Sequence, residues 1–310
     1  MIDTNTPKVS VCIPTFNAAD YLRQAVESVL AQDYQDYEIV IVDNCSTDHT
    51  VSLVSELQQL SNGRIRFYQN DRNIGLVGNL NRCLEYAKGA YIKFLCADDM
   101  LLPGCLEKMA AGLDLHPPVK LVSCGRLVID MYGNKLGSRH YVAGDNIVSG
   151  KQVITRCLFV GNFIGEPTAV MFRKTDLKGC FREDMPQLSD MDMWFQLLEQ
   201  GDLLSLEKPL YAIRSHPAQM THSNVRSGRL IEDNIKLFET YSQKSYLEAT
   251  WLLRLQHKLL MTYRVWVSRK SISDETRKMV LDRYASRSAY ALMPVVELVL
   301  HLKERMASTK

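Results

Sequence analysis

The sequence predicts an α/β protein, with a mixed, mainly parallel sheet between helices and a helical C-terminal region. Up to about residue 224, short apolar runs alternate with segments whose apolar residues recur at helical spacing. This alternation is typical of parallel sheets covered by helices on both faces. Beyond that point Gly and Pro become rare and the helical spacing continues. We therefore expect an α/β domain over residues 1–224 and a helical region over residues 225–310.

The short apolar runs are the expected strands, over residues 9–13, 38–42, 64–68, 91–95, 120–124, 127–131, 168–172 and 209–214. Apolar residues three or four positions apart predict helices between them. These helices are expected over residues 19–31, 50–60, 75–87, 103–113, 152–159 and 190–200. Gly201 follows the last of them and is expected to be its C-cap.

Composition and charge exclude several classes of protein. A net charge of +2 is too small to indicate a nucleic-acid partner. The part from Trp251 onward carries 12 basic and 5 acidic residues, which leaves the preceding part acidic. The eight cysteines form no C-x-x-C pair and lie mostly in apolar runs, which predicts reduced thiols in a cytoplasmic protein. We expect neither an export signal nor a membrane-spanning helix.

Polar and acidic residues follow the ends of four predicted strands. They form the segments Pro14-Thr15-Phe16-Asn17, Asp43-Asn44-Cys45-Ser46-Thr47-Asp48, Asn70-Asp71-Arg72-Asn73-Ile74-Gly75 and Ala97-Asp98-Asp99. In an open α/β sheet, ligands bind beyond the carboxyl ends of the strands. Because carboxylates gathered at one edge repel each other, they indicate a bound cation or sugar hydroxyls. The alternative for any single loop is that these residues only form turns and helix caps.

Residues 8–222 resemble glycosyltransferase family 2. The resemblance rests on six motifs in order: the strand into Pro14-Thr15-Phe16-Asn17, Asp43-Asn44-x-Ser46-Thr47-Asp48, Asn73-x-Gly75, Asp98-Asp99, Ser189-Asp190-Met191-Asp192-Met193-Trp194 and Tyr211-x-x-Arg214-x-His216. It implies the GT-A fold and an inverting transfer of sugar from a nucleotide-diphosphate sugar to an acceptor hydroxyl. The chain departs from the family at Cys96, where many members carry an acid, so Asp98 and Asp99 remain for the metal motif.

The resemblance also implies site residues. Asp43 is expected to hold the nucleotide base with Thr15 close by, and Asp98 to face the ribose or sugar. Asp99 is the expected ligand of Mn²⁺ or Mg²⁺, with His216 as a further ligand of the metal or the pyrophosphate. The other expected contacts of the nucleotide or sugar are Pro14, Asn17, Arg72, Asn73 and Glu166. For Arg72 the alternative is a solvated surface arginine, and for His216 a surface or packing role.

Asp190 is the expected catalytic base. The resemblance places it at the family's acidic base motif. On a helix, Asp190 would share the inward face with Trp194 and Leu198, whereas Asp192 would lie on a solvated stripe. Burial would raise the pKa of Asp190 toward the range useful for accepting a proton. The alternative is that Asp190 only caps its helix.

Two other classes of protein remain as alternatives, and the partners follow from the resemblance. A sugar nucleotidyltransferase usually needs a Gly-rich basic loop, which is absent, and a non-catalytic nucleotide-sugar-binding homologue would not need Asp99 and Asp190 together. A dehydrogenase is excluded because no G-x-G-x-x-G follows the first strand. The resemblance implies a UDP-sugar donor and a glycan or lipid-linked acceptor in cell-surface polysaccharide biosynthesis.

The basic amphipathic segment after Trp251 has two interpretations. It can lie on the inner membrane face, where an anionic surface attracts its Lys and Arg side chains. Alternatively, its apolar stripe packs on the first domain or on a partner chain. The residues of this stripe are Leu252, Leu253, Leu255, Leu259, Leu260, Tyr263 and Trp266.

Overall fold

The computed structural model describes residues 6–140, 144–216 and 229–294. The chain divides into two compact units, which are residues 1–154 with 162–216, and residues 155–161 with 217–310. The expected boundary between residues 224 and 225 lies outside the described residues.

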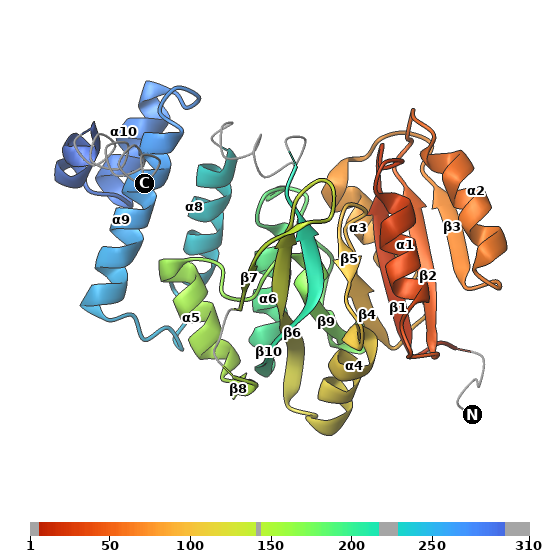
Figure 1. The fold of residues 1–310 in the computed structure, drawn as a ribbon. Coiled ribbons are helices and arrows are strands. Elements are labelled where there is room, and N and C mark those ends of the chain that lie inside the picture. The colour runs from red at the N-terminus through yellow and green to blue at the C-terminus, as the bar shows by residue number, and fades with distance from the viewer. Residues whose placement is uncertain (1–5, 141–143, 217–228, 295–310) are drawn as a thin grey trace, which may run out of the picture. The chain divides into compact units, whose positions relative to one another are not determined.

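The first unit is built on a mixed sheet (Figure 1). Its strands are β1 (Val9–Thr15), β2 (Tyr37–Asp43), β3 (Ile65–Gln69), β4 (Tyr91–Phe94), β5 (Met100–Leu101), β6 (Val119–Ile129), β7 (Lys135–Arg139), β8 (Asn146–Val148), β9 (Val170–Arg173) and β10 (Asp202–Arg214). The order across the sheet is β3-β2-β1-β4-β9-β6-β10-β5, with β7 on β6 and β8 on β10. The pairs β3–β2, β2–β1, β1–β4 and β6–β10 are parallel, and β9 is antiparallel to both of its neighbours.

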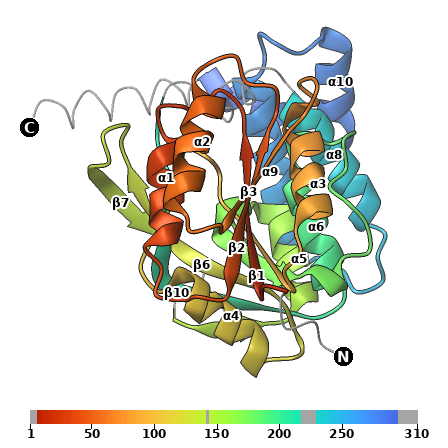
Figure 2. The same cartoon turned by 90° about the vertical axis from the view of Figure 1, so that its right-hand side faces the viewer.

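Helices cover both faces of this sheet, as the alternation of apolar patterns predicts. The helices are α1 (Leu22–Leu30), α2 (Thr50–Leu60), α3 (Gly75–Tyr86), α4 (Cys105–Leu115) and α6 (Ser189–Leu198), with short 3₁₀ turns η1 (Pro167–Ala169) and η2 (Lys174–Asp176). A further helix, α5 (Gly150–Val160), begins in the first unit and has residues 155–160 in the second. Figure 2 shows α1 and α2 on one face of the sheet and α3 and α6 on the other. Strands β1 and β2 are buried along their whole length because both of their faces are covered.

Two details of the prediction are wrong. The strands expected over 120–124 and 127–131 are one strand, β6, which runs through Gly125. This glycine interrupts the apolar pattern because a Cβ at its position would lie 2.4 Å from the Glu207 carbonyl oxygen. Gly201 is not the C-cap of α6, since Glu199 holds that position in a right-handed conformation. Gly201 is instead packed against the chain at Pro118, where a Cβ would lie 2.2 Å from a carbonyl oxygen.

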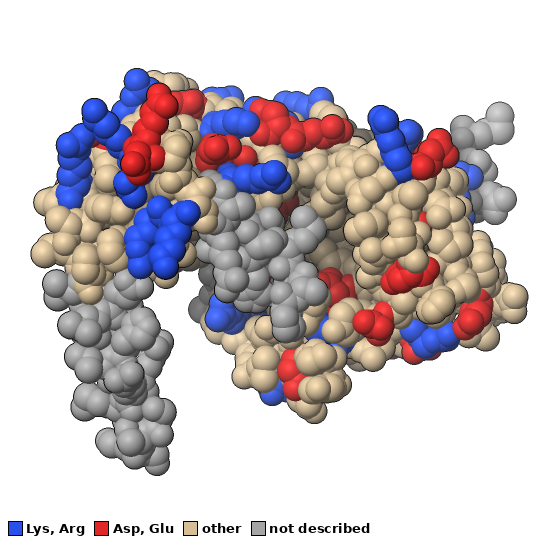
Figure 3. Space-filling model, turned by 90° about the horizontal axis from the view of Figure 1, so that it is seen from above, with Lys and Arg blue, Asp and Glu red and all other residues tan. Residues whose placement is uncertain are grey.

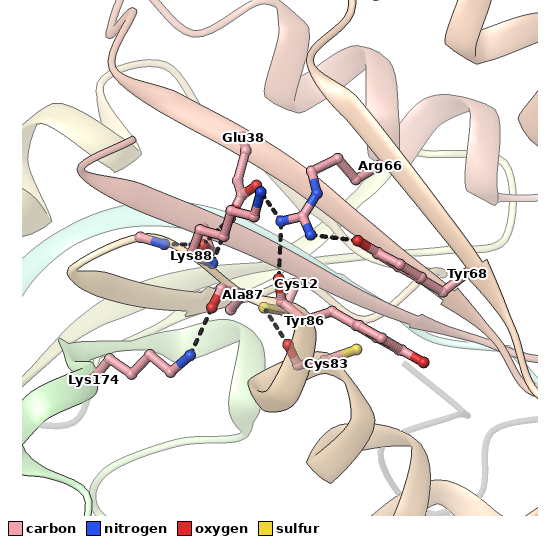
Figure 4. Close-up of polar contacts among 11 residues, drawn as sticks. Cys12, Glu38, Arg66, Tyr68, Cys83, Tyr86, Ala87, Lys88 and Lys174 are labelled. Atoms are coloured by element: carbon pink, nitrogen blue, oxygen red, sulfur yellow. Dashed lines mark hydrogen bonds and ion pairs between the residues drawn. The ribbon is translucent and has the colours of Figure 1, made fainter. Parts of the chain in front are cut away.

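A partly buried ion pair and its hydrogen bonds join the first three strands near their amino ends (Figure 4). Glu38 accepts hydrogen bonds from Arg66 Nη1 at 2.7 Å, Ser10 Oγ at 2.6 Å and the Lys88 main-chain N–H at 2.7 Å. Burial raises the pKa of Glu38, but these hydrogen bonds outweigh it and hold the pKa below its ordinary value. The carboxylate is therefore ionised and connects strands that are distant in sequence.

Replacing Glu38 by Ala is expected to lower the free energy of unfolding by about 3 kcal/mol, because the Arg66 charge and two donors lose their buried acceptor. Urea unfolding followed by circular dichroism measures this loss. Glu56→Ala is the matched control, since its ion pair with Arg23 is exposed and is worth less than about 1 kcal/mol. Equal midpoints for the two variants would contradict this role of Glu38.

The second unit is helical and has its own apolar core. Its described helices are α8 (Arg229–Tyr241), α9 (Trp251–Val267) and α10 (Asp274–Arg283). The core consists of Ile231, Met261, Val265, Val280 and Ala285. The rings of Phe238 and His257 stack with centroids 4.3 Å apart, and Phe159 meets both edge-on. Within the described ranges, no helix combines the length and the apolar character needed to cross a bilayer.

Candidate active site

The loops after β1 and β2 interlock at the carboxyl edge of the sheet. Asn17 and Cys45 adopt left-handed backbone conformations there, with φ of 47° and 64°. Asn17 Oδ1 accepts the Thr47 N–H at 2.8 Å, and Asn17 N–H donates to Ser46 Oγ at 2.8 Å. Asp43 is buried at the end of β2 and accepts hydrogen bonds from Ser46, including its N–H at 3.0 Å. Asp43 therefore fixes the loop on which the expected nucleotide contacts lie.

The remaining nucleotide-side residues differ in exposure. Thr15 is buried and donates to the Ile13 carbonyl oxygen at 3.1 Å, and Pro14 is buried beside it in β1. Asn73 Oδ1 accepts from Asn44 Nδ2 and from the Gly75 N–H, each at 2.9 Å, so it shapes the turn before α3. Arg72 is exposed at this turn. The structure brings these residues to one edge, and their contact with a ligand stays a prediction.

Sequence reasoning missed an amide network under these loops. Asn79, on α3, is 2% exposed and donates to the Val42 carbonyl oxygen at 2.9 Å. Its Oδ1 accepts from Asn70 Nδ2 at 2.9 Å, and Asn70 also donates to Asn44 Oδ1 at 3.1 Å. The available signal was an asparagine at an inward position of an apolar helix. The network holds the loops after β2 and β3 in one arrangement.

Asp98 and His216 form a pair of potential metal ligands at the same edge. The Asp98 Oδ2 and His216 Nε2 atoms lie 3.0 Å apart, with side chains 30% and 10% exposed. Ligand atoms of Cys96, Asp98 and Asp99 lie within 4.8 Å of one another. Figure 3 looks onto this edge of the first unit, where the surface is hollowed and acidic side chains are exposed. The donor set of carboxylate and imidazole fits a divalent cation.

Asp99 has a different environment from Asp98. It is 3% exposed, and its two oxygens accept from Thr168 Oγ1 at 2.7 Å and from the Arg214 N–H at 3.1 Å. Burial raises the pKa of Asp99 well above its ordinary value, and the Asp98 charge raises it further. The expectation that Asp99 is the metal ligand stays a prediction. The geometry favours Asp98 with His216, and Asp99 as the group that holds their loop.

Arg214 is the residue that connects this corner of the site. Only 1% exposed, it donates from Nε to the Asp98 carbonyl oxygen at 2.9 Å and from Nη2 to Gln24 Oε1 at 2.7 Å. Its Nη1 donates to two carbonyl groups of the β6–β7 turn. Arg214 therefore holds the backbone of Asp98, and His216 follows Arg214 two residues farther along the chain. The sequence showed Arg214 only as part of a motif.

Glu166 lies within a second charged group. Its backbone is extended before Pro167, as predicted for a residue preceding proline. Glu166 Oε1 accepts from the Tyr211 hydroxyl at 2.8 Å and from Arg126. Beneath it, the fully buried Lys93 donates to the carbonyl groups of Thr168 and Val170. These contacts fix η1 and Glu166, the N-cap residue that precedes it.

Asp190 is an acid near the start of α6 that is mostly, but not fully, buried. Burial raises its pKa to about 7, the Glu166 charge adds to this, and the Met191 N–H at 2.7 Å opposes it. The N-cap residue is Leu188, without a side-chain hydrogen bond. The Asp190 carboxylate nevertheless accepts the first-turn Met191 N–H, so both the catalytic role and the helix-end role of Asp190 stay predictions. With a pKa of about 7, Asp190 is poised to exchange a proton near neutral pH.

The expectation that Asp192 is solvated is wrong. Asp192 is 1% exposed because α6 is buried on nearly all sides, and a helix without a solvated face has no solvated stripe. Its carboxylate accepts from Gln196 Nε2 at 2.7 Å and lies 3.7 Å from Arg182 Nη1. These two partners compensate its burial.

The fold is of the GT-A class, and comparison with known proteins gives the family of this chain. A model of glycosyl transferase family 2 matches residues 10–181. The chain is 31% identical over 218 residues to the putative glycosyltransferase EpsE of Bacillus subtilis, covering 67% of this chain and 73% of that one. It is also 31% identical over 241 residues to an uncharacterized protein of Mycobacterium tuberculosis, covering 72% of each. The chain belongs to glycosyl transferase family 2.

Solved structures share its fold. The UDP complex of S. aureus TarS 1-349 superposes with a TM-score of 0.57 at 19% identity, covering 93% of this chain and 91% of that one. In the longer TarS structure, the matched part is 54% of that chain. The mannosyltransferase PcManGT from Pyrobaculum calidifontis, in complex with GDP-Man and Mn²⁺, gives a TM-score of 0.57 at 18% identity, covering 99% and 84%. At this identity, the likeness supports the fold.

Proposed function

We propose that this chain transfers a sugar from a nucleotide-diphosphate sugar to an acceptor hydroxyl with inversion at the anomeric carbon. The observation that carries the mechanism is Asp190, an acid with a pKa of about 7 in the unit that also holds Asp98 and His216. In the proposed step, the acceptor oxygen bonds to the anomeric carbon as the bond from that carbon to the diphosphate oxygen breaks. The electron pair leaves with the diphosphate, and the hydroxyl proton passes to Asp190.

We propose Asp98 and His216 as the protein ligands of Mn²⁺ or Mg²⁺, with Asp99 and Arg214 positioning them. When bound, such a cation neutralises the charge that develops on the leaving diphosphate. The fit rests on the carboxylate and imidazole atoms 3.0 Å apart. The Mn²⁺ in the PcManGT complex supports the choice of metal.

The donor and acceptor are proposed by likeness. TarS 1-349 structures contain UDP and UDP-GlcNAc, whereas PcManGT contains GDP-Man, so we propose a UDP-sugar first and a GDP-sugar second. For the acceptor we propose a glycan or lipid-linked glycan of cell-surface polysaccharide biosynthesis. We propose that the transfer takes place in the cytoplasm.

A panel of UDP- and GDP-sugars with Mn²⁺ or Mg²⁺ is expected to give slow release of nucleoside diphosphate by hydrolysis even without acceptor. The measurement is coupled detection of the diphosphate, with excess chelator as the control that removes the metal. A sugar nucleotidyltransferase would release pyrophosphate when given sugar phosphate and nucleoside triphosphate. A non-catalytic binder would show a thermal shift with a donor and release neither product. Full activity in excess chelator would contradict the metal requirement.

A further inference from the structure

The side chains of α9 divide between a buried and an exposed face. His257, Met261 and Val265 are buried in the second unit. A stripe of large apolar side chains is exposed, and we name it the α9 stripe: Trp251 (74%), Leu252 (49%), Leu255 (42%), Leu259 (44%), Tyr263 (54%) and Val267 (38%). Steps of four residues from Trp251 through Leu255, Leu259 and Tyr263 keep these side chains on one side of the helix. A contiguous apolar stripe of this kind marks an interaction surface.

The charge on α9 and on the loop after it has one sign, although exposed acids flank this stretch at Glu248 and Asp274. From residue 251 to residue 273 the chain contains five basic residues and no acid. Arg254 and Lys258 are exposed on α9 itself, and Lys270 is exposed just after it. Arg264 is instead drawn inward, where its guanidinium donates to Asn234 Oδ1 on α8. The exposed part of this segment is thus apolar along one stripe and basic beside it.

We propose that α9 lies in the plane of an anionic membrane surface, with the α9 stripe in the lipid and Arg254 and Lys258 at the headgroups. Apolar burial and attraction to anionic lipid both contribute to such binding. A second copy of this chain fits less well, because two α9 helices would bring like charges together and α9 itself carries no acid to pair them. The helix does not meet the requirements for crossing the bilayer.

This inference goes beyond the proposed transfer reaction and agrees with it. A transferase held at a membrane surface meets acceptors that are attached to lipid, which is one of the acceptor classes proposed above. Vesicle binding is measured without donor or acceptor. Its failure would therefore leave the proposed reaction untouched.

The test is co-sedimentation of the full chain with vesicles of phosphatidylcholine, with and without phosphatidylglycerol, at low and high salt. We expect binding to the anionic vesicles at low salt, at least about tenfold weaker on phosphatidylcholine alone and at high salt. The tryptophan emission of the chain is expected to shift to the blue on binding, as the exposed indole of Trp251 leaves water. Binding to both lipids alike, or to neither at low salt, would overturn the proposal.

Two double variants assign the binding to α9. Leu255→Gln with Leu259→Gln, and separately Arg254→Gln with Lys258→Gln, are each expected to weaken sedimentation at least about tenfold. The matched control is Leu60→Gln with Leu115→Gln, two exposed leucines on other helices, which is expected to sediment like wild type. Circular dichroism checks that each variant is folded. Unchanged binding of the α9 variants would overturn the assignment. So would a different finding, in which the wild-type chain forms a dimer at high salt and does not bind vesicles, and Leu255→Gln with Leu259→Gln dissociates that dimer.

Discussion

Replacing Asp98 by Asn is expected to lower metal-dependent turnover by at least about 10²-fold. The carboxylate is the hard oxygen ligand of the proposed pair, and the amide that replaces it is neutral and binds Mn²⁺ poorly. In the wild-type structure Asp98 Oδ2 lies 3.0 Å from His216 Nε2, so both groups can reach one cation. Initial rates of nucleoside diphosphate release during a Mn²⁺ titration measure the loss. Electron paramagnetic resonance of Mn²⁺ without donor measures binding independently of activity.

Two further variants give this prediction its controls. Asp71→Asn removes an exposed acid from the loop after β3 and is expected to leave the Mn²⁺ titration unchanged. Asp99→Asn disturbs a buried group that holds Thr168 and Arg214, so we expect a lower melting temperature as well as lower activity. If Asp98→Asn binds Mn²⁺ normally while Asp99→Asn is fully stable and binds none, Asp99 is the ligand and our assignment is reversed.

The sheet was predictable from sequence because the strands of the first unit are buried on both faces. A short, unbroken apolar run such as that in β1 is typical of a strand that is buried on both faces of a sheet. Strand β6 was divided in two because Gly125 and Arg126 interrupt its apolar pattern. In the structure Arg126 is turned to Glu166, and Gly125 allows the Glu207 backbone to approach. Both contacts join segments that are distant in sequence, so a local sequence pattern cannot predict them.

The site was predictable as a set of loops, but not as a set of contacts. The rule that ligands bind at the carboxyl ends of strands brings Asp43 and Asp98 to one edge. That His216 meets Asp98 depends on the pairing of β10 with β5, across more than a hundred residues of chain. The helical-stripe argument failed for Asp192 because α6 is buried on almost all sides. Periodicity distinguishes two faces only where one of them meets water.

Replacing Asp190 by Asn is expected to lower the rate of transfer by about 10² to 10⁴-fold. Asn has nearly the same shape and can still accept the Met191 N–H, but it cannot take a proton from the acceptor hydroxyl. Donor binding, measured by calorimetry with UDP-sugar and Mn²⁺, is expected to stay near wild type. Glu199→Gln, at the other end of α6, is the control and should transfer normally. Near wild-type transfer by Asp190→Asn would show that another group is the base.

The pH dependence of the rate supplies a second readout of the same role. The ionised form of Asp190 accepts the proton, so wild-type kcat/KM should rise with pH and level off above about 7. Below that pH the rise should approach tenfold per pH unit, whereas the residual rate of Asp190→Asn should lack this limb. A wild-type profile that is flat from pH 5 to pH 8 would contradict the assignment.

Stability should move in the direction opposite to activity. The pKa of Asp190 is about 7 in the folded protein and about 4 in an unfolded chain. Between these two values the folded state binds the proton more tightly, so wild type loses stability as the pH rises from about 4 to about 7. Asn carries no charge at any of these pH values, and Asp190→Asn escapes that loss. At pH 8 its melting temperature should therefore equal or exceed that of wild type, and the two should approach each other at pH 4. A residue that served only the helix end would give the reverse, a variant less stable at pH 8 with unchanged transfer.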